Sequence, residues 1–361
     1  MQHYKKIFLL ILFFSLTNLW AFGDKYANSF LKNGTGVREV SLGGAVVSNA
    51  SVTSSFYWNP ALLINTDYIS GRIMHAEEFA GVLNIDHVAV SFPNIKNYKI
   101  GIGFIRSAVD DIPLVKESSL IDIGSDGIAP GDENYPGPDA DGTEGNGQLD
   151  DGEYLDFGKI GRFGTSESAF FLSVAKNHSD KIAYGLSVKT LYKDLYASKG
   201  FGVGVDFGLL YHWNDKINLG MNISDITTTY LFWNDGEKEV IAPEVRLGGS
   251  YHFILGKFTL EPMLGINATF DGEKNNSLFG SEALNVKAVA GLETIFRNQV
   301  SLRFGIDENE NLHLGAGINT SLAALNYGLG FGGTYSALGN SHQLELTFNL
   351  ENFTAMIKNN L

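Results

Sequence analysis

Large apolar side chains alternate with small or polar ones over many short segments of the chain. In residues 182–189, Ile, Tyr, Leu and Val alternate with Ala, Gly, Ser and Lys, and residues 201–211, 219–224, 325–332 and 343–350 repeat the pattern. A period of two places neighbouring side chains on opposite faces of a β-strand. One face is apolar and the other is rich in Gly, Asn and Ser, as expected for a barrel with lipid outside and a lumen inside.

This pattern predicts fourteen strands. They cover residues 70–78, 82–92, 98–107, 167–177, 182–193, 201–212, 217–227, 243–254, 257–269, 284–297, 300–306, 311–320, 323–333 and 341–350. Connections after even-numbered strands are short, and most connections after odd-numbered strands are longer. Because membrane barrels separate short turns from long loops in this way, we predict an all-β fold, a 14-stranded antiparallel transmembrane β-barrel.

The first 21 residues have the order of a secretory signal peptide. Lys5 and Lys6 precede an apolar stretch over 7–16, and the small residue Ala21 follows. The stretch is about half the ~20 residues that a membrane-spanning helix needs. We therefore predict a cleaved signal peptide at 1–21 and a mature barrel at 67–361. The expected location is the outer membrane of a Gram-negative-type bacterium, in contact with outer-membrane lipid and with both termini periplasmic.

Composition narrows the possible functions. The chain has no Cys, which excludes disulfide scaffolds and thiolate metal sites, and its net charge of −14 argues against nucleic acid as a partner. It contains no His-Glu-x-x-His, Gly-x-Ser-x-Gly or Walker motif, and Gly-x-Gly pairs do not open a helix after a strand. We therefore predict that the chain is not an enzyme and has neither catalytic residues nor an organic cofactor.

Residues 22–66 lack the alternation of the strands. They contain Arg38, the pair Gly43 and Gly44, and the run Tyr57, Trp58, Asn59 and Pro60. A Pro after Asn marks a turn or the start of a helix. An irregular segment ahead of the first strand is predicted to fold into the lumen as a short N-terminal plug.

Two stretches of this segment resemble the PorV/PorQ family, a branch of the FadL-like outer-membrane barrels. They are a Gly-x-Arg-x-x-x-x-Gly-Gly-Ala stretch from Gly36 to Ala45 and a Tyr-Trp-Asn-Pro-Ala stretch from Tyr57 to Ala61. A late Leu-Gly-x-x-His element at Leu338, Gly339 and His342 is also similar to the family. One departure is the C-terminus, which ends in Leu361 instead of the aromatic residue common in barrel proteins.

The resemblance implies a function as well as a fold. Some members of the family work in type IX secretion, so the leading expectation is type IX-like protein secretion or cargo handling, with secretion-system components or secreted cargo as partners. FadL itself moves hydrophobic solutes, so passive transport of hydrophobic small molecules is the alternative. A structural or adhesive outer-membrane protein is the second alternative.

The longest predicted loop, residues 108–165, is strongly acidic. It holds fourteen acidic and three basic side chains, a net charge of −11. Its stretch from Asn146 to Glu153 matches positions 5 to 12 of an EF-hand calcium loop. We therefore expect an extracellular Ca²⁺ site, although about three residues are inserted between its two halves. The predicted ligands are Asp139, Asp141, Asn146, the Gln148 carbonyl, Asp150 and Glu153.

Overall fold

A computed structural model describes residues 29–270, 279–280, 284–332 and 339–354. The predicted signal peptide, the motif residue Leu338 and the C-terminal Leu361 lie outside the described residues. The chain forms two compact units. One contains residues up to Ala108 and from Ser166 onward, and the other is Val109–Thr165.

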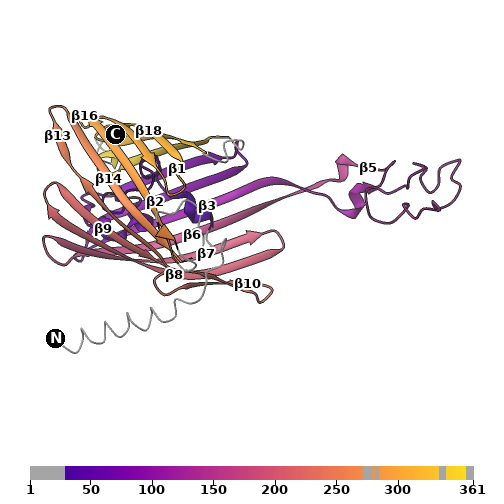
Figure 1. Ribbon diagram of the computed structural model, residues 1–361, viewed down its shortest axis with the longest axis horizontal. Coiled ribbons are helices and arrows are strands. Elements are labelled where there is room, and N and C mark those ends of the chain that lie inside the picture. Colours follow the sequence, from indigo (N-terminus) through magenta and orange to yellow (C-terminus); the bar gives the residue numbers. More distant parts are fainter. Residues whose placement is uncertain (1–28, 271–278, 281–283, 333–338, 355–361) are drawn as a thin grey trace. The chain divides into compact units, whose positions relative to one another are not determined.

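The first unit is a wall of antiparallel strands (Figure 1). Its strands are β1 (Ser70–Glu78), β2 (Leu83–Ile95), β3 (Tyr98–Leu114), β6 (Gly161–Asn177), β7 (Ile182–Leu195), β8 (Ser198–Asn214), β9 (Ile217–Ser224), β10 (Thr229–Trp233), β11 (Lys238–Ile241), β12 (Glu244–Tyr251), β13 (Phe253–Leu255), β14 (Phe258–Thr269), β15 (Phe279–Gly280), β16 (Asn285–Phe296), β17 (Val300–Ile306), β18 (Leu312–Asn319), β19 (Ala323–Phe331) and β20 (Ser341–Asn349).

The wall closes on itself between its first and last strands. β1 pairs antiparallel with β2 along one edge and with β20 along the other, from the pair Ser70 and Asn349 to the pair Glu77 and His342. β9 and β10 together occupy one strand position of the barrel. β11, β12 and β13 together occupy the next one. The all-β, 14-stranded closed antiparallel barrel predicted from the sequence is thereby confirmed.

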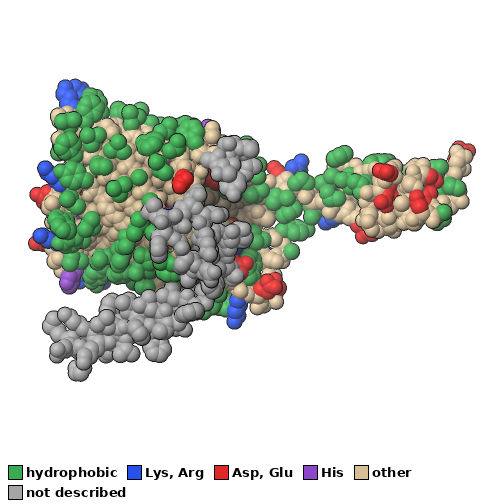
Figure 2. Space-filling view, in the orientation of Figure 1, with side chains coloured by type: hydrophobic (Ala, Val, Ile, Leu, Met, Phe, Trp, Pro, Cys, Tyr) green, Lys and Arg blue, Asp and Glu red, His purple; other side chains and the backbone are tan. Residues whose placement is uncertain are grey.

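Side chains alternate between the outer and inner faces of the wall. In β7, Tyr184, Leu186 and Val188 are exposed on the outer face, whereas Lys189 and Lys193 are buried inside. Hydrophobic side chains cover much of the visible outer surface of the barrel (Figure 2). An apolar exterior around a polar interior is the arrangement of a barrel that spans a membrane.

The connections differ between the two ends of the barrel. At one end, here called the turn end, residues 96–97, 178–181, 215–216, 256–257, 297–299 and 320–322 join neighbouring strands. Aromatic rings gather there: Tyr211 and Trp213 lie 6.3 Å apart, and Tyr251 and Phe253 lie 6.5 Å apart. Amphipathic rings favour the boundary between membrane and water. The opposite end is called the loop end.

The seventh strand position differs from the prediction of one strand over 217–227 followed by a loop over 228–242. β9 stops at Ser224, and the chain resumes pairing with β8 through β10, which forms a hairpin with β11. Asp225 and Thr228 between them have φ angles of 54° and 58°. A left-handed backbone is costly for a β-branched residue and cannot continue a strand. The left-handed backbone between Asp225 and Thr228 therefore interrupts the strand after Ser224.

Among the described residues, which begin at Ser29, four short helical segments precede β1. They are η1 (Ser29–Asn33), α2 (Val37–Ser41), α3 (Ser55–Trp58) and η2 (Pro60–Asn65). No helix within the described residues is long and apolar enough to cross a membrane.

The second unit, Val109–Thr165, includes the last residues of β3 and the first residues of β6, and it has its own small sheet between them. β4 (Leu120–Ile121) pairs with β5 (Tyr154–Leu155), and the single turns η3 (Glu117–Ser119) and η4 (Phe157–Lys159) flank the pair. The Asp156 N–H donates to the Ser119 carbonyl at 2.8 Å, which fastens the two turns together. The remainder, from residue 122 to residue 153, consists of turns and irregular chain.

The outward position of Leu186 predicts how the barrel responds to charge. Leu186→Arg is expected to lower the free energy of unfolding by about 2–4 kcal/mol, because a cation near mid-membrane loses its water. Tyr192→Arg is the control, since Tyr192 is exposed on the same face of β7 but lies nearer the loop end. Denaturant titration of both variants in lipid vesicles checks the difference. Equal losses would contradict the lipid-facing assignment of the β7 midpoint.

Candidate functional site

The segment before β1 lies against the inner face of the barrel wall. The backbone of Val47 approaches Gly220 of β9, Asn59 approaches Gly208 of β8, and Gly43 approaches Gly305 of β17. A Cβ atom added at any of these three wall glycines would lie less than 3 Å from the segment. Glycines on the inner face of the strands therefore make room for the segment's backbone.

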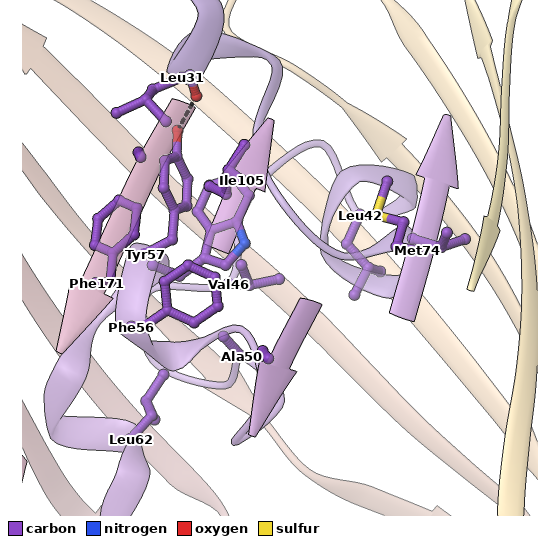
Figure 3. Close-up of a cluster of buried hydrophobic side chains, with 14 of the residues drawn as sticks. Leu31, Leu42, Val46, Ala50, Phe56, Tyr57, Leu62, Met74, Ile105 and Phe171 are labelled. Atoms are coloured by element: carbon purple, nitrogen blue, oxygen red, sulfur yellow. Dashed lines mark hydrogen bonds between the residues drawn. The ribbon is translucent and has the colours of Figure 1, made fainter. Parts of the chain in front are cut away.

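Apolar side chains of the segment form a cluster with inward-facing side chains of the wall (Figure 3). The rings of Phe56 and Phe171 lie 5.0 Å apart, and Leu62 and Ile105 are at most 1% exposed. Burial of large apolar groups stabilises the docked segment by about 25 cal/mol per Å² of apolar surface removed from water.

The Tyr-Trp-Asn-Pro run is held by hydrogen bonds through its polar atoms. The Tyr57 hydroxyl donates to the Leu31 carbonyl at 2.5 Å, a bond visible in Figure 3, and the Trp58 indole N–H donates to the Thr35 carbonyl at 2.7 Å. Asn59 donates to the Leu209 carbonyl of β8 at 3.0 Å and accepts from the Ala61 N–H at the start of η2. Pro60 fits the first position of that turn because it needs no N–H partner there.

The Gly43 and Gly44 pair turns the chain sharply after α2. Their φ angles are 64° and 72°, in the left-handed region that favours glycine. The turn brings Gly44 against the ring of Trp58, where an added Cβ would lie 3.0 Å from the ring. The two motif stretches, separated by 11 residues in the printed sequence, therefore meet in space.

Arg38 of α2 binds acidic side chains of the wall. Its guanidinium lies 2.6 Å from Glu293 of β16 and 3.6 Å from Glu261 of β14, and it donates to the Asn49 carbonyl at 2.6 Å. Glu293 also accepts from Arg303 of β17 at 2.7 Å. One buried carboxylate thus binds an arginine of the segment and an arginine of the wall.

A second group of charges joins α2 to the seam between β1 and β20. Arg72 lies 3.4 Å from Glu345 and 3.7 Å from Glu39, and it donates to the Thr35 hydroxyl at 3.1 Å. The backbone N–H of Val37 donates to Glu345 at 3.0 Å. Since Arg72 and Glu39 are both fully buried, each needs the other's charge.

A third charged cluster lies beside the interruption between β9 and β10. Lys189 of β7 donates to Asp206 and to Asp225, each at 2.9 Å. The Asp225 N–H donates to Asp206 at 2.8 Å, and the Thr229 hydroxyl donates to Asp225 at 2.6 Å. Lys189 therefore fixes the segment between β9 and β10 against β8 on the inner face of the barrel.

Two cavities lie on opposite sides of α2 within the lumen. The loop-end cavity has a volume of about 300 Å³, and Val40, Trp58 and Arg246 contribute to its wall. The turn-end cavity has a volume of about 230 Å³, and its wall includes Arg38 and Thr347. The segment thus separates a space near one mouth of the barrel from a space near the other.

The loop-end cavity combines aromatic and charged side chains. The guanidinium of Arg246 lies 4.8 Å from the ring of Tyr57 and 5.1 Å from that of Trp58, within the range of a cation–π contact. It also forms an ion pair with Glu244 at 2.6 Å. Glu308, in the β17–β18 connection, lies in the same wall, and burial together with the charge of Glu244 raises its pKa.

The residues predicted to bind calcium all lie in the second unit, where hydrogen bonds occupy them. Asp141 accepts from the hydroxyls of Ser125 and Thr143, which lowers its pKa, and Asp139 accepts from the N–H of Asp126 at 3.2 Å. Among the described residues, no group of three or more acidic or histidine side chains is placed to hold a metal ion.

The other predicted ligands are connected through a short network. Asn146 donates to Asp150 and accepts from the Gln148 N–H, each at 2.6 Å, while Glu153 accepts from the Asp150 N–H at 2.9 Å. The structure therefore links Asn146, Gln148, Asp150 and Glu153 to each other. It does not gather the acids around one point, and the Ca²⁺ site stays a prediction.

The charged residues of the wall were not singled out from the sequence. Glu293, Arg303 and Glu345 occupy positions that alternate with outward apolar residues, so they lie on the same face as the lumen glycines. An ionisable side chain on the Gly-rich face of a predicted strand is the signal that could have identified them.

Comparison with known proteins finds structures of similar fold but no matching sequence. Neither a protein-family model nor a curated protein sequence matches the chain. Two structures of the Pseudomonas putida toluene transporter TodX superpose with TM-scores of 0.50 and 0.52, at 11% and 12% identity. The superpositions cover 87% of this chain and 97% and 96% of the two TodX chains. A Pseudomonas aeruginosa FadL homologue covers a similar share, with a TM-score of 0.48 and 10% identity.

The chain thus has the same barrel fold as the toluene transporter TodX. The expectation of type IX-like secretion is wrong, because the structures that superpose on the chain are those of a toluene transporter. They match the alternative stated above, and they are transport proteins rather than enzymes.

Because the segment packs closely against Gly305, adding one methyl group there is expected to destabilise the barrel. In Gly305→Ala, the new Cβ would collide with the backbone of Leu42 and Gly43. We expect a loss of about 1–3 kcal/mol of unfolding free energy and faster proteolysis of the segment before β1. Gly71→Ala is the control, because a Cβ there meets only Leu350 at 3.4 Å. Unfolding and limited proteolysis of both variants measure the effect, and equal behaviour would argue against tight docking.

Proposed function

We propose that this protein lets hydrophobic small molecules pass through the outer membrane. The observation that carries the proposal is the loop-end cavity, a space of about 300 Å³ inside the lumen whose wall includes Tyr57, Trp58 and Phe331. Pockets for small organic molecules are concave and lined by aromatic and apolar groups with a few polar ones. The fold shared with toluene transporters supports the same conclusion.

We further propose that the N-terminal segment is a plug that controls this passage. The segment lies between the two lumen cavities and is attached to the wall by the ion pairs of Arg38 and Glu39. In this proposal the loop end is extracellular, both ends of the chain are periplasmic, and a solute moves from the loop-end cavity past the segment. The proposed transport is passive, so the solute crosses down its concentration gradient.

The proposed function predicts faster uptake of toluene. Cells that lack their own hydrophobic-compound channels should take up radiolabelled toluene several-fold faster when they make this protein than when they carry an empty vector. The outer leaflet otherwise resists apolar solutes, so a protein route becomes visible as an increased initial rate. Glucose uptake in the same cells is the control for general leakiness. Equal toluene rates with and without the protein would refute the proposed function.

A second prediction concerns the plug. Deleting residues 22–66 should raise the single-channel conductance in planar bilayers, because the two cavities would join into one aqueous path. The point variant Glu293→Gln should have a smaller effect, since it weakens one ion pair of Arg38 and leaves the apolar cluster in place. Heat-modifiable migration on gels verifies that each variant forms a barrel. A high conductance in the intact protein, unchanged by the deletion, would exclude a plug.

A further inference from the structure

We propose that the outer face of the barrel binds a lipid whose headgroup is a phosphorylated sugar, the class to which lipopolysaccharide belongs. The site is a polar belt at the loop end of five neighbouring strands, β3, β2, β1, β20 and β19. The polar belt consists of Arg106, Asp86, His75, Glu77, His342 and Tyr327. It lies outside the lumen, so this inference goes beyond the proposed function and uses only its orientation, with the loop end extracellular.

Strand alternation places the polar belt on the outer face of the wall. Met74 and Ala76, on either side of His75, are buried, whereas His75 itself is exposed. His75 pairs across the strands with Asp86, and Asp86 pairs with Arg106. These three side chains therefore form one outward row, with 38% to 50% of each side chain exposed.

The neighbouring outward row on the turn-end side is apolar. It consists of Ile73, Val88 and Phe104, which pair across the same three strands and are all exposed. A charged side chain is costly within the hydrocarbon of a membrane, whereas apolar side chains are favoured there. The change from one row to the next therefore marks the level at which acyl chains end and headgroups begin.

The distance along β2 agrees with this level. Asp86 lies nine residues from Ile95, the last residue of the strand at the turn end. At a rise of about 3.3 Å per residue and a tilt of about 40°, this length covers about 23 Å of membrane thickness. Since the apolar band of an outer-membrane barrel is about 25 Å tall, the polar belt lies at headgroup depth on the loop-end side.

Arg106 has donor groups that the protein leaves largely unused. Within the described part of the chain, its guanidinium has one polar contact, a distance of 3.9 Å from Nη1 to Asp86. This distance is longer than a hydrogen bond, and Asp86 is bound instead to Nδ1 of His75 at 2.8 Å. A planar guanidinium with free N–H groups fits the oxygens of a phosphate.

A second donor lies at the other end of the polar belt. The Tyr327 hydroxyl and Nδ1 of His342 are 2.8 Å apart, and when the hydroxyl donates, Nε2 of His342 carries a proton and can donate in turn. The strand of His342, β20, is three strand spacings from β3, a separation of about 14 Å. A headgroup that contacts both Arg106 and His342 therefore needs acceptors that are far apart.

Between these two donors the polar belt offers acceptors. Asp86 and Glu77 flank His75, with Oε1 of Glu77 at 3.7 Å from its Nε2. The remaining lone pairs of the two carboxylates can accept from hydroxyl groups. A phosphorylated disaccharide has hydroxyls between its phosphates and matches this order of donors and acceptors. A simple diacyl phospholipid has one phosphate, which reaches only one end of the polar belt.

Native mass spectrometry of the full-length protein in mild detergent tests the site with bisphosphorylated lipid A as the probe. The protein should bind lipid A about tenfold more tightly than the same lipid without its phosphates. Arg106→Gln should lower the affinity for lipid A about tenfold, because it removes a charge-assisted contact. Lys176→Gln is the matched control, since Lys176 is a cation of the neighbouring strand β6 that lies over the ring of Tyr98 at the turn end.

Each outcome decides for or against the site. Equal binding of lipid A with and without phosphates, or equal affinities of Arg106→Gln and Lys176→Gln, would refute it. Phosphatidylglycerol that binds as tightly as lipid A would refute the sugar headgroup. A lipid-free dimer that Arg106→Gln dissociates would assign the polar belt to a second copy of the chain and overturn the inference. A heat-modifiable gel shift verifies that each variant forms a barrel.

The lipid site and the proposed function can fail separately. Arg106→Gln should leave toluene uptake unchanged, because Arg106 is on the outer face and contributes to neither lumen cavity. If the protein binds lipid A as expected but does not accelerate toluene uptake, the proposed function is refuted and the lipid site stands. If toluene uptake is accelerated but lipid A is not bound, the reverse holds.

Discussion

The buried pair of Arg38 and Glu293 is the interaction on which the interior of the barrel depends. A carboxylate inside a protein is tolerated only when it is paired, because the loss of its hydration costs several kcal/mol. Glu293 is 1% exposed and receives two arginines, one from the N-terminal segment and one from β17. Removing the segment would take away one of the two arginine partners of Glu293, so this shared carboxylate makes the segment and the wall stabilise each other.

This mutual dependence is built into the backbone as well as into the charges. Where the segment's chain passes closest to the wall, the wall carries glycine: Gly185, Gly208, Gly220 and Gly305. Where it passes farther away, the wall carries longer polar side chains that reach inward, such as Arg72 and Glu345. Small and charged residues therefore play complementary roles on the inner face.

The sequence predicted the barrel well because the outer face obeys one simple constraint. Lipid contact requires an apolar residue at every second position, and that period identified fourteen strands, each of which overlaps a strand of the structure. The break after Ser224 was missed because Asp225 is positioned by Lys189, 36 residues earlier, and no local pattern contains that contact. The same reason applies to the site. Tyr57 and Trp58 could be singled out as a motif, but their contact with Arg246 depends on the docking of two distant segments.

The polar interior also bears on how an apolar molecule could use this lumen. A hydrocarbon gains little binding free energy from a wall of paired charges. It cannot replace the hydrogen bonds that water makes to polar atoms, and breaking the ion pairs costs free energy. The loop-end cavity differs from the turn-end cavity in this respect, because Trp58 and Tyr57 supply aromatic surface on one side of the segment only. In the proposed function, the loop-end cavity is therefore the better binding place for a solute than the turn-end cavity. Under the proposed function, a solute held in the loop-end cavity lies next to the segment, and its passage toward the turn end would require the ion pairs of Arg38 and Glu39 to rearrange.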